Sequence, residues 1–181
     1  MQKRSPMRPP ILAPVCLVVG ALLGLAGTFM PSPSTRALAW GVDGAALVTA
    51  GAVLFVYHLR QGHDMVASGF LVFTVGQTLI LSGAAMSLEA SAPSFAAGAA
   101  LWAVSLALVS TPRVLPSIVR GLGFIAAVLF AATSLQILAG RSLTPLSEPI
   151  PFFAYPFLVF TLFGWAWACL RSPARYSRSS L

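Results

Sequence analysis

Three polar side chains interrupt long apolar stretches of this sequence: Asp43, Gln77 and Glu89. A carboxylate in such a stretch needs a partner, because burying an unpaired charge is costly, and a cation or a cationic solute can be that partner. A buried amide must also find hydrogen-bond partners, on a neighbouring helix or on a ligand. We therefore predict one polar pocket that contains Asp43, Gln77 and Glu89. The possible partners of this pocket are Arg36, Gln136 and Arg141.

A structural explanation of the same residues stays open. Asp43 lies among glycines, where a carboxylate can cap a shortened helix, or it can form an ion pair with Arg36 or Arg141. Gln77 can link two helices through hydrogen bonds, with Ser134 as a candidate partner. The sequence favours these structural contacts over a ligand pocket, because Asp43 lies near the predicted membrane interface.

The two histidines do not predict a metal or haem site. His58 and His63 flank a short polar turn beside Asp64, whereas a zinc site needs at least three protein ligands and a transmembrane haem needs histidines inside the membrane. The chain has no HExxH motif, no glycine-rich phosphate loop and no paired aspartate array. We therefore expect no metal, no cofactor and no catalytic residue, and a lipid-modifying enzyme is the least favoured class.

The composition is that of a membrane protein. Only 8% of the residues are charged and 57% are hydrophobic, whereas a soluble domain carries about 25% charged residues. The formal charge of +7 does not indicate nucleic-acid binding, because the eleven Lys and Arg lie singly or at the two chain ends. Topology signals and contacts to anionic lipid explain them better.

Six apolar segments must position the polar side chains, and each is close to the length of about 20 residues that spans a membrane. We predict an all-α bundle of six transmembrane helices at residues 11–30, 38–59, 65–86, 95–109, 115–138 and 150–170. A basic cytoplasmic lead, 1–10, precedes this transmembrane domain, 11–170. The basic tail, 171–181, is predicted to be disordered because it has nothing to bury.

Three local features refine the predicted spans. The first span is longer than the apolar core of a signal peptide, so we interpret 11–30 as a span rather than a cleaved signal. Gly140 should end the fifth span. Pro156 lies inside the sixth span and should kink it.

The positions of the basic residues predict the orientation. In a six-span arrangement nine Lys and Arg fall on one side, namely three in the lead, Arg60, Arg113, Arg120 and three in the tail. Only Arg36 and Arg141 fall on the other side. Because Lys and Arg are enriched on the cytoplasmic side, we predict that both termini are cytoplasmic and that the polar pocket faces outward. The expected location is a bacterial cytoplasmic (inner) membrane.

Small residues indicate how the first span packs. Gly20, Gly24 and Gly27 form a stripe at helical spacing that lets a neighbouring helix come close, so a homo-oligomer or a membrane partner through this stripe is possible. A second pattern is the run Gly-Ala-Ala-Leu at 44–47, which recurs at 98–101. This recurrence is consistent with a duplicated hairpin or with chance.

These observations predict a small multi-pass inner-membrane protein without a recognisable catalytic motif. A non-enzymatic packing or accessory membrane protein is the favoured function, because loops are nearly absent and intramembrane charge is scarce. The alternative is a small-solute or cation carrier, or a binding subunit, with an outward-facing pocket around Asp43, Gln77 and Glu89. No motif identifies the substrate, the partner or the oligomeric state.

Overall fold

The computed structural model describes residues 9–171, which form six α-helices and no β-strand. The helices are α1 (Leu12–Thr28), α2 (Pro33–Arg60), α3 (Asp64–Ser82), α4 (Ala92–Ser110), α5 (Ser117–Leu138) and α6 (Ala154–Arg171). Helices α2 to α6 are long and apolar enough to cross a membrane, and α1 is a shorter apolar helix, which fits a multi-pass membrane protein. Most of the predicted basic lead and tail lies outside the described residues.

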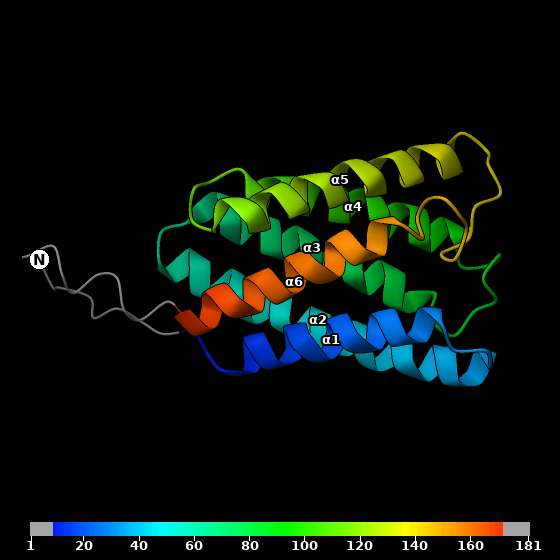
Figure 1. Cartoon of the computed structure of the whole chain (residues 1–181), viewed down its shortest axis with the longest axis horizontal. Helices are drawn as coiled ribbons and strands as arrows, with labels where there is room; N and C mark the ends of the chain where they lie inside the picture. The colour runs from blue at the N-terminus through cyan, green and yellow to red at the C-terminus, as the bar shows by residue number, and fades with distance from the viewer. Residues whose placement is uncertain (1–8, 172–181) are drawn as a thin grey trace, which may run out of the picture.

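The six helices form a closed ring. Each helix packs against its neighbours in the sequence, and α6 packs against α1 to close the ring. Figure 1 shows α6 in front, between α1 and α5, with the connections alternating between the two ends of the bundle. Short connections favour antiparallel packing of sequential helices, so the order along the chain becomes the order around the ring.

Aromatic side chains fill one part of the interior. The ring of Phe73 is buried and lies 5.6 Å from that of Trp165 and 6.2 Å from that of Trp102. The contacts continue from Trp102 to Phe130 at 5.0 Å and from Trp165 to Phe70 at 4.9 Å. Because these rings come from α3, α4, α5 and α6, their packing joins four helices in one aromatic cluster.

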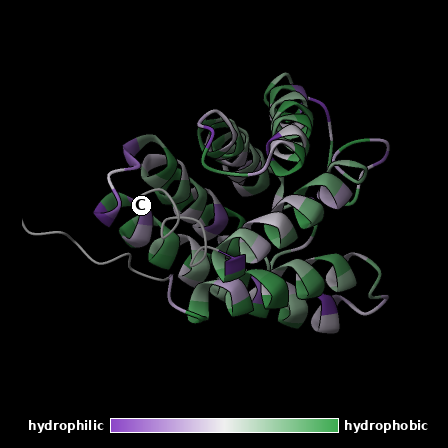
Figure 2. Ribbon diagram, turned by 60° about the vertical axis from the view of Figure 1, so that its left-hand side comes forward, coloured by the Kyte–Doolittle hydropathy of each residue, from purple (hydrophilic) through white to green (hydrophobic). Residues whose placement is uncertain are grey.

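The outer surface of the bundle is also apolar. Ile118, Val128 and Leu138 on α5 expose 77%, 68% and 73% of their surface. Figure 2 shows hydrophobic residues along the helices, with the most hydrophilic residues mainly at helix ends and connections. A surface of this kind suits lipid better than water.

Several helix ends differ from the sequence prediction, among them the starts of α2 and α6. Helix α2 begins at Pro33, five residues earlier than predicted, because proline suits the start of a helix, where no backbone N–H is needed. Helix α6 begins at Ala154, four residues later than predicted, so Pro156 lies in its first turn and does not kink its interior. Gly140 follows α5 with a φ of +86°, the left-handed conformation that commonly ends a helix.

Glycines bring α3 and α4 close together. A Cβ added to Gly98 on α4 would lie 2.8 Å from the carbonyl oxygen of Gly76 on α3. A Cβ added to Gly76 would lie 2.9 Å from the Cβ of Leu101. The two backbones therefore meet at a crossing where only glycine fits without displacement.

The recurring Gly-Ala-Ala-Leu runs do not occupy equivalent positions. Gly44 on α2 faces Leu81 on α3. Its counterpart Gly98 on α4 faces Ile80 and Gly76, which also belong to α3. A duplicated hairpin would turn Gly98 toward α5, so the surroundings of these two glycines do not support a duplication.

Candidate functional site

A cavity of about 70 Å³ lies inside the ring, and every helix except α5 contributes to its lining. It extends from the middle of the bundle toward the end where α1 joins α2 and α5 joins α6, because Thr28 and Pro145 belong to its lining. Most of the wall is apolar. The lining side chains with polar atoms are Thr28, Trp40, Asp43, Gln77, Ser91, Trp102 and Tyr155. Among the described lining residues, Asp43 is the one carboxylate, and none is Lys, Arg or His.

Asp43 lies inside α2 rather than at its start. Because α2 begins at Pro33, Asp43 is about 15 Å further along the helix and does not cap its N-terminus. Two glycines of α1 make room for the carboxylate: a Cβ on Gly24 would lie 3.1 Å from Oδ2, and a Cβ on Gly20 would lie 3.2 Å from Oδ1. Asp43 Oδ1 is buried and has no hydrogen-bond partner within residues 9–171. A proton, a water, a cation or a ligand must satisfy it, since an unpaired buried carboxylate oxygen is costly.

Gln77 is on the inner face of α3, and only 1% of its surface is exposed. Its Oε1 finds no hydrogen-bond donor in the described part of the chain. Thr74, one turn away, donates instead to the carbonyl of Phe70 at 2.9 Å, and the Oγ of Ser134 is itself buried and unpartnered. Asp43 and Gln77, on two different helices, each have an unpartnered buried oxygen, and both residues belong to the lining of one cavity.

Aromatic side chains from three helices form part of the same wall. Trp40 Nε1 donates to the carbonyl of Gly24 at 3.3 Å. The hydroxyl of Tyr155 donates to the carbonyl of Pro145 at 2.9 Å. Trp102 Nε1 is buried with no acceptor among the described residues. Two of the rings are thus fixed by hydrogen bonds, and the third adds an unpartnered N–H group to the lining.

The sequence alone does not assign these rings to the pocket. Trp102 lies in the middle of α4, whereas Trp in membrane helices is enriched near the interfaces, and this unusual position was the available signal. Trp40 and Tyr155 give no such signal, because a helix that is apolar all round does not reveal which face turns inward.

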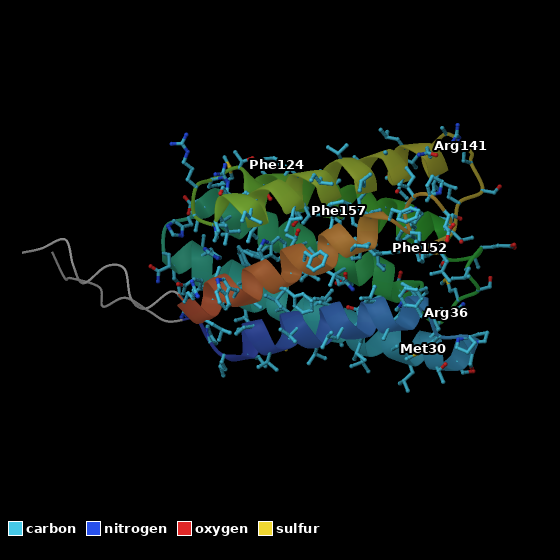
Figure 3. All side chains as sticks on the ribbon, viewed as in Figure 1. Met30, Arg36, Phe124, Arg141, Phe152 and Phe157 are labelled. Carbon is cyan, nitrogen blue, oxygen red and sulfur yellow. The ribbon has the colours of Figure 1, made fainter. Side chains whose placement is uncertain are left out.

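The two arginines predicted near the pocket bind elsewhere. Arg36 Nη2 donates to the carbonyl of Met30 at 2.8 Å, and Arg141 Nη1 donates to Oε1 of Gln136 at 2.9 Å. Figure 3 shows Arg36 and Arg141 at the same end of the bundle. Neither of them, nor Gln136, belongs to the lining of the Asp43 cavity. That lining therefore includes no basic side chain to neutralise the carboxylate.

Glu89 lies apart from the Asp43 cavity. Helix α3 ends at Ser82, four residues earlier than predicted, and Glu89 is exposed in the connection to α4. It lines a second hollow of about 340 Å³ together with Arg36. Trp40 lines both hollows, so the two are adjacent. The structure thus brings Asp43 and Gln77 to one cavity and places Glu89 beside it.

His58 lies in the last turn of α2 and His63 in the connection to α3, at the opposite end of the bundle from Arg36 and Arg141. The Nδ1 atoms of His58 and His63 are 3.4 Å apart, and the ring of His58 stacks on Phe70 at 5.4 Å. No three His, Cys, Asp or Glu side chains within residues 9–171 are placed to hold a metal ion. Packing and a mutual contact therefore account for both histidines.

The side chains around the cavity combine one carboxylate and one amide with several aromatic faces. A carboxylate and an amide oxygen accept hydrogen bonds, and aromatic faces attract positive charge. An anion would meet the carboxylate without a basic residue to offset the repulsion. No family model, no curated protein and no solved structure matches this chain, so its functional assignment depends on these side chains.

Proposed function

We propose that this protein spans a bacterial cytoplasmic membrane six times and binds a small cationic solute in the Asp43 cavity. Five helices have the length and composition of membrane spans, and α1, with 17 residues, is at the lower limit of the length that can cross. The protein would act as a binding subunit or carrier rather than as an enzyme.

One observation carries the proposal. Asp43 Oδ1 and Gln77 Oε1 are buried, unpartnered within the described chain, and belong to residues that line the same cavity. With the Asp43 carboxyl group ionised, both atoms accept hydrogen bonds or contact a cation. The cavity volume of about 70 Å³ is several times the roughly 10–15 Å³ that one water molecule requires. A small solute therefore has both the space and the charge complementarity that binding requires.

The distribution of basic residues supports an outward-facing cavity. Arg60 ends α2, Arg113 lies in the α4–α5 connection and Arg171 ends α6, all at one end of the bundle. Arg36 and Arg141 are at the other end, toward which the cavity extends. Since Lys and Arg are enriched at cytoplasmic ends, both termini would lie in the cytoplasm and the solute would enter from outside.

A purely accessory role through the glycine stripe of α1 has less support. Gly20 faces Leu47, and Gly27 faces the ring of Trp40, so the stripe packs against α2 of the same chain. A homo-oligomer or partner that binds through these glycines stays a prediction. Such a partner would have to displace α2 from its contact with α1.

Calorimetry on the full chain in lipid nanodiscs tests the binding proposal. Ammonium, alkylammonium, Na⁺ and K⁺ salts would be titrated at constant ionic strength. We expect saturable binding of at least one cation, and loss of that binding in Asp43→Asn. The matched control is Asp64→Asn, which removes an exposed carboxylate at the other end of the bundle and should leave binding unchanged. Absence of binding, or equal binding by wild type and Asp43→Asn, would show that the proposal is wrong.

A further inference from the structure

We propose that the bound cation is a small alkylammonium ion with at least one N–H group. Asp43 and Gln77 accept hydrogen bonds from its N–H groups, while its charged group and its alkyl part contact the aromatic and aliphatic wall. This inference rests on the proposed binding of a cation and names the chemical class of that cation.

The charge of the cavity matches a singly charged ligand. Asp43 is the one carboxylate among the described lining residues, so one positive charge neutralises the site. A divalent ion would keep an uncompensated charge inside an apolar bundle, which is costly.

The unpartnered oxygen atoms are few for a bare metal ion. Calcium takes about six to eight oxygen ligands, and magnesium demands near-octahedral coordination. Two side-chain oxygens of lining residues are buried and unpartnered, Asp43 Oδ1 and Gln77 Oε1, while the hydroxyls of Thr28 and Ser91 are each held in a hydrogen bond to a backbone carbonyl. A primary ammonium group has three N–H donors, so two or three acceptors satisfy it. The unpartnered Asp43 Oδ1 and Gln77 Oε1 are two such acceptors.

The wall of the cavity favours an organic cation over an inorganic one. Trp is the strongest aromatic partner of a cation within about 6 Å of the ring centroid, and Trp40 and Trp102 both belong to the lining. The aliphatic part of the wall includes Leu47, Leu158 and Leu162. An alkyl chain gains free energy against such a surface, whereas a hydrated inorganic ion gains none.

The decisive measurement compares a homologous series on the wild-type protein. Affinity should rise about fourfold per added methylene from ammonium through methyl-, ethyl- and propylammonium, until the cavity is full. Tetramethylammonium has no N–H group and should bind at least about tenfold more weakly than propylammonium, which is similar in carbon content, because it loses a hydrogen bond to a charged acceptor. Na⁺ and K⁺ should bind more weakly than propylammonium. This series needs no variant, so misfolding of a mutant cannot obscure it.

Variants then locate the binding site. Trp40→Leu should weaken propylammonium binding about 2- to 30-fold, the range expected for loss of one cation–π contact. Trp167→Leu is the matched control, because Trp167 is half exposed on the outside of α6 and does not line the cavity. Equal losses in both variants would overturn the assignment of the alkyl part to the aromatic wall.

The outcomes separate this inference from the function on which it rests. If Na⁺ or K⁺ binds more tightly than propylammonium in a manner that depends on Asp43, the alkylammonium assignment is wrong and the cation-binding function stands. A flat affinity across the series, or equal affinity for tetramethylammonium, leads to the same conclusion. Binding of neutral acetamide that equals that of propylammonium, or binding that ignores Asp43, would overturn both.

Discussion

Gly24 of α1 and Asp43 of α2 face each other so closely that a Cβ on Gly24 would lie 3.1 Å from Asp43 Oδ2 and 3.3 Å from Oδ1. The small-residue stripe of α1 therefore provides the space that the carboxylate occupies. The same stripe receives the ring of Trp40 at Gly27, so the absence of side chains on α1 shapes two parts of the cavity wall.

Gly24→Ala should weaken ligand binding without unfolding the protein. The added methyl group is tight but not prohibitive, so the carboxylate has to move by a few tenths of an ångström. Weakening one hydrogen bond to a charged group by about 1 kcal/mol corresponds to a roughly fivefold loss of alkylammonium affinity. The control is Gly41→Ala on α2, where nothing lies within 4 Å of the added Cβ. An unchanged affinity in Gly24→Ala would show that the space provided by Gly24 does not influence ligand binding.

Gly98→Ala should destabilise the bundle. Its Cβ would lie 2.8 Å from the carbonyl oxygen of Gly76, and a backbone atom cannot rotate away as a side chain can. We expect a loss of about 1–3 kcal/mol in the free energy of unfolding, the usual cost of overpacking. Unfolding in detergent, followed by circular dichroism, measures it. Gly121→Ala on the exposed face of α5 meets nothing within 4 Å and should be neutral or slightly stabilising through its higher helix propensity.

Arg120→Met should loosen the end of α4. Arg120 Nε donates to the carbonyl of Ser110 at 2.6 Å, and its Nη2 donates to that of Thr111 at 3.0 Å, so the guanidinium satisfies carbonyls that the helix leaves free. Loss of these two hydrogen bonds should lower the free energy of unfolding by about 1–2 kcal/mol, since hydrogen bonds from charged groups are stronger than those between neutral groups. Arg113 is exposed in the connection between α4 and α5, and Arg113→Met should reduce the stability much less. Equal losses would mean that net charge, rather than this cap, is responsible.

The two ends of the bundle should label from opposite sides of the membrane. Single cysteines would replace Ser5, Ser34, Ser142 or Ser177 in a chain whose Cys16 and Cys169 are changed to Ala. An impermeant maleimide added to intact cells should modify positions 34 and 142, and should reach positions 5 and 177 only after the membrane is opened. The reverse pattern would place the Asp43 cavity toward the cytoplasm.

The helices could be predicted because each apolar run ends at proline, glycine or charged residues. Their exact ends were harder to predict: α3 ends at Ser82, directly before Gly83, but the residues Ala84, Ala85 and Met86 that follow favour helix, so the sequence does not mark Gly83 as the end. This early end leaves Glu89 in a connection and out of the Asp43 cavity. Local sequence does not determine where packing against a neighbour stops favouring helix.

The polar residues of the candidate site could be predicted from the sequence, but the aromatic residues Trp40 and Tyr155 could not. Asp43 and Gln77 stand out because a charge or an amide is rare in an apolar run. Trp40 and Tyr155 do not, since apolar residues cover both the lipid-facing and the inward faces of these helices. The hydrophobic pattern that marks the core of a soluble helix is therefore missing.

Closure of the ring by α6 has a consequence for biosynthesis. Tyr155, Leu158 and Leu162 of α6 belong to the cavity wall, and α6 follows the other five described helices along the chain. During synthesis, the carboxylate on α2 is therefore inserted before the helix that completes its enclosure. A chain interrupted before α6 would contain Asp43 but would lack this part of the cavity wall.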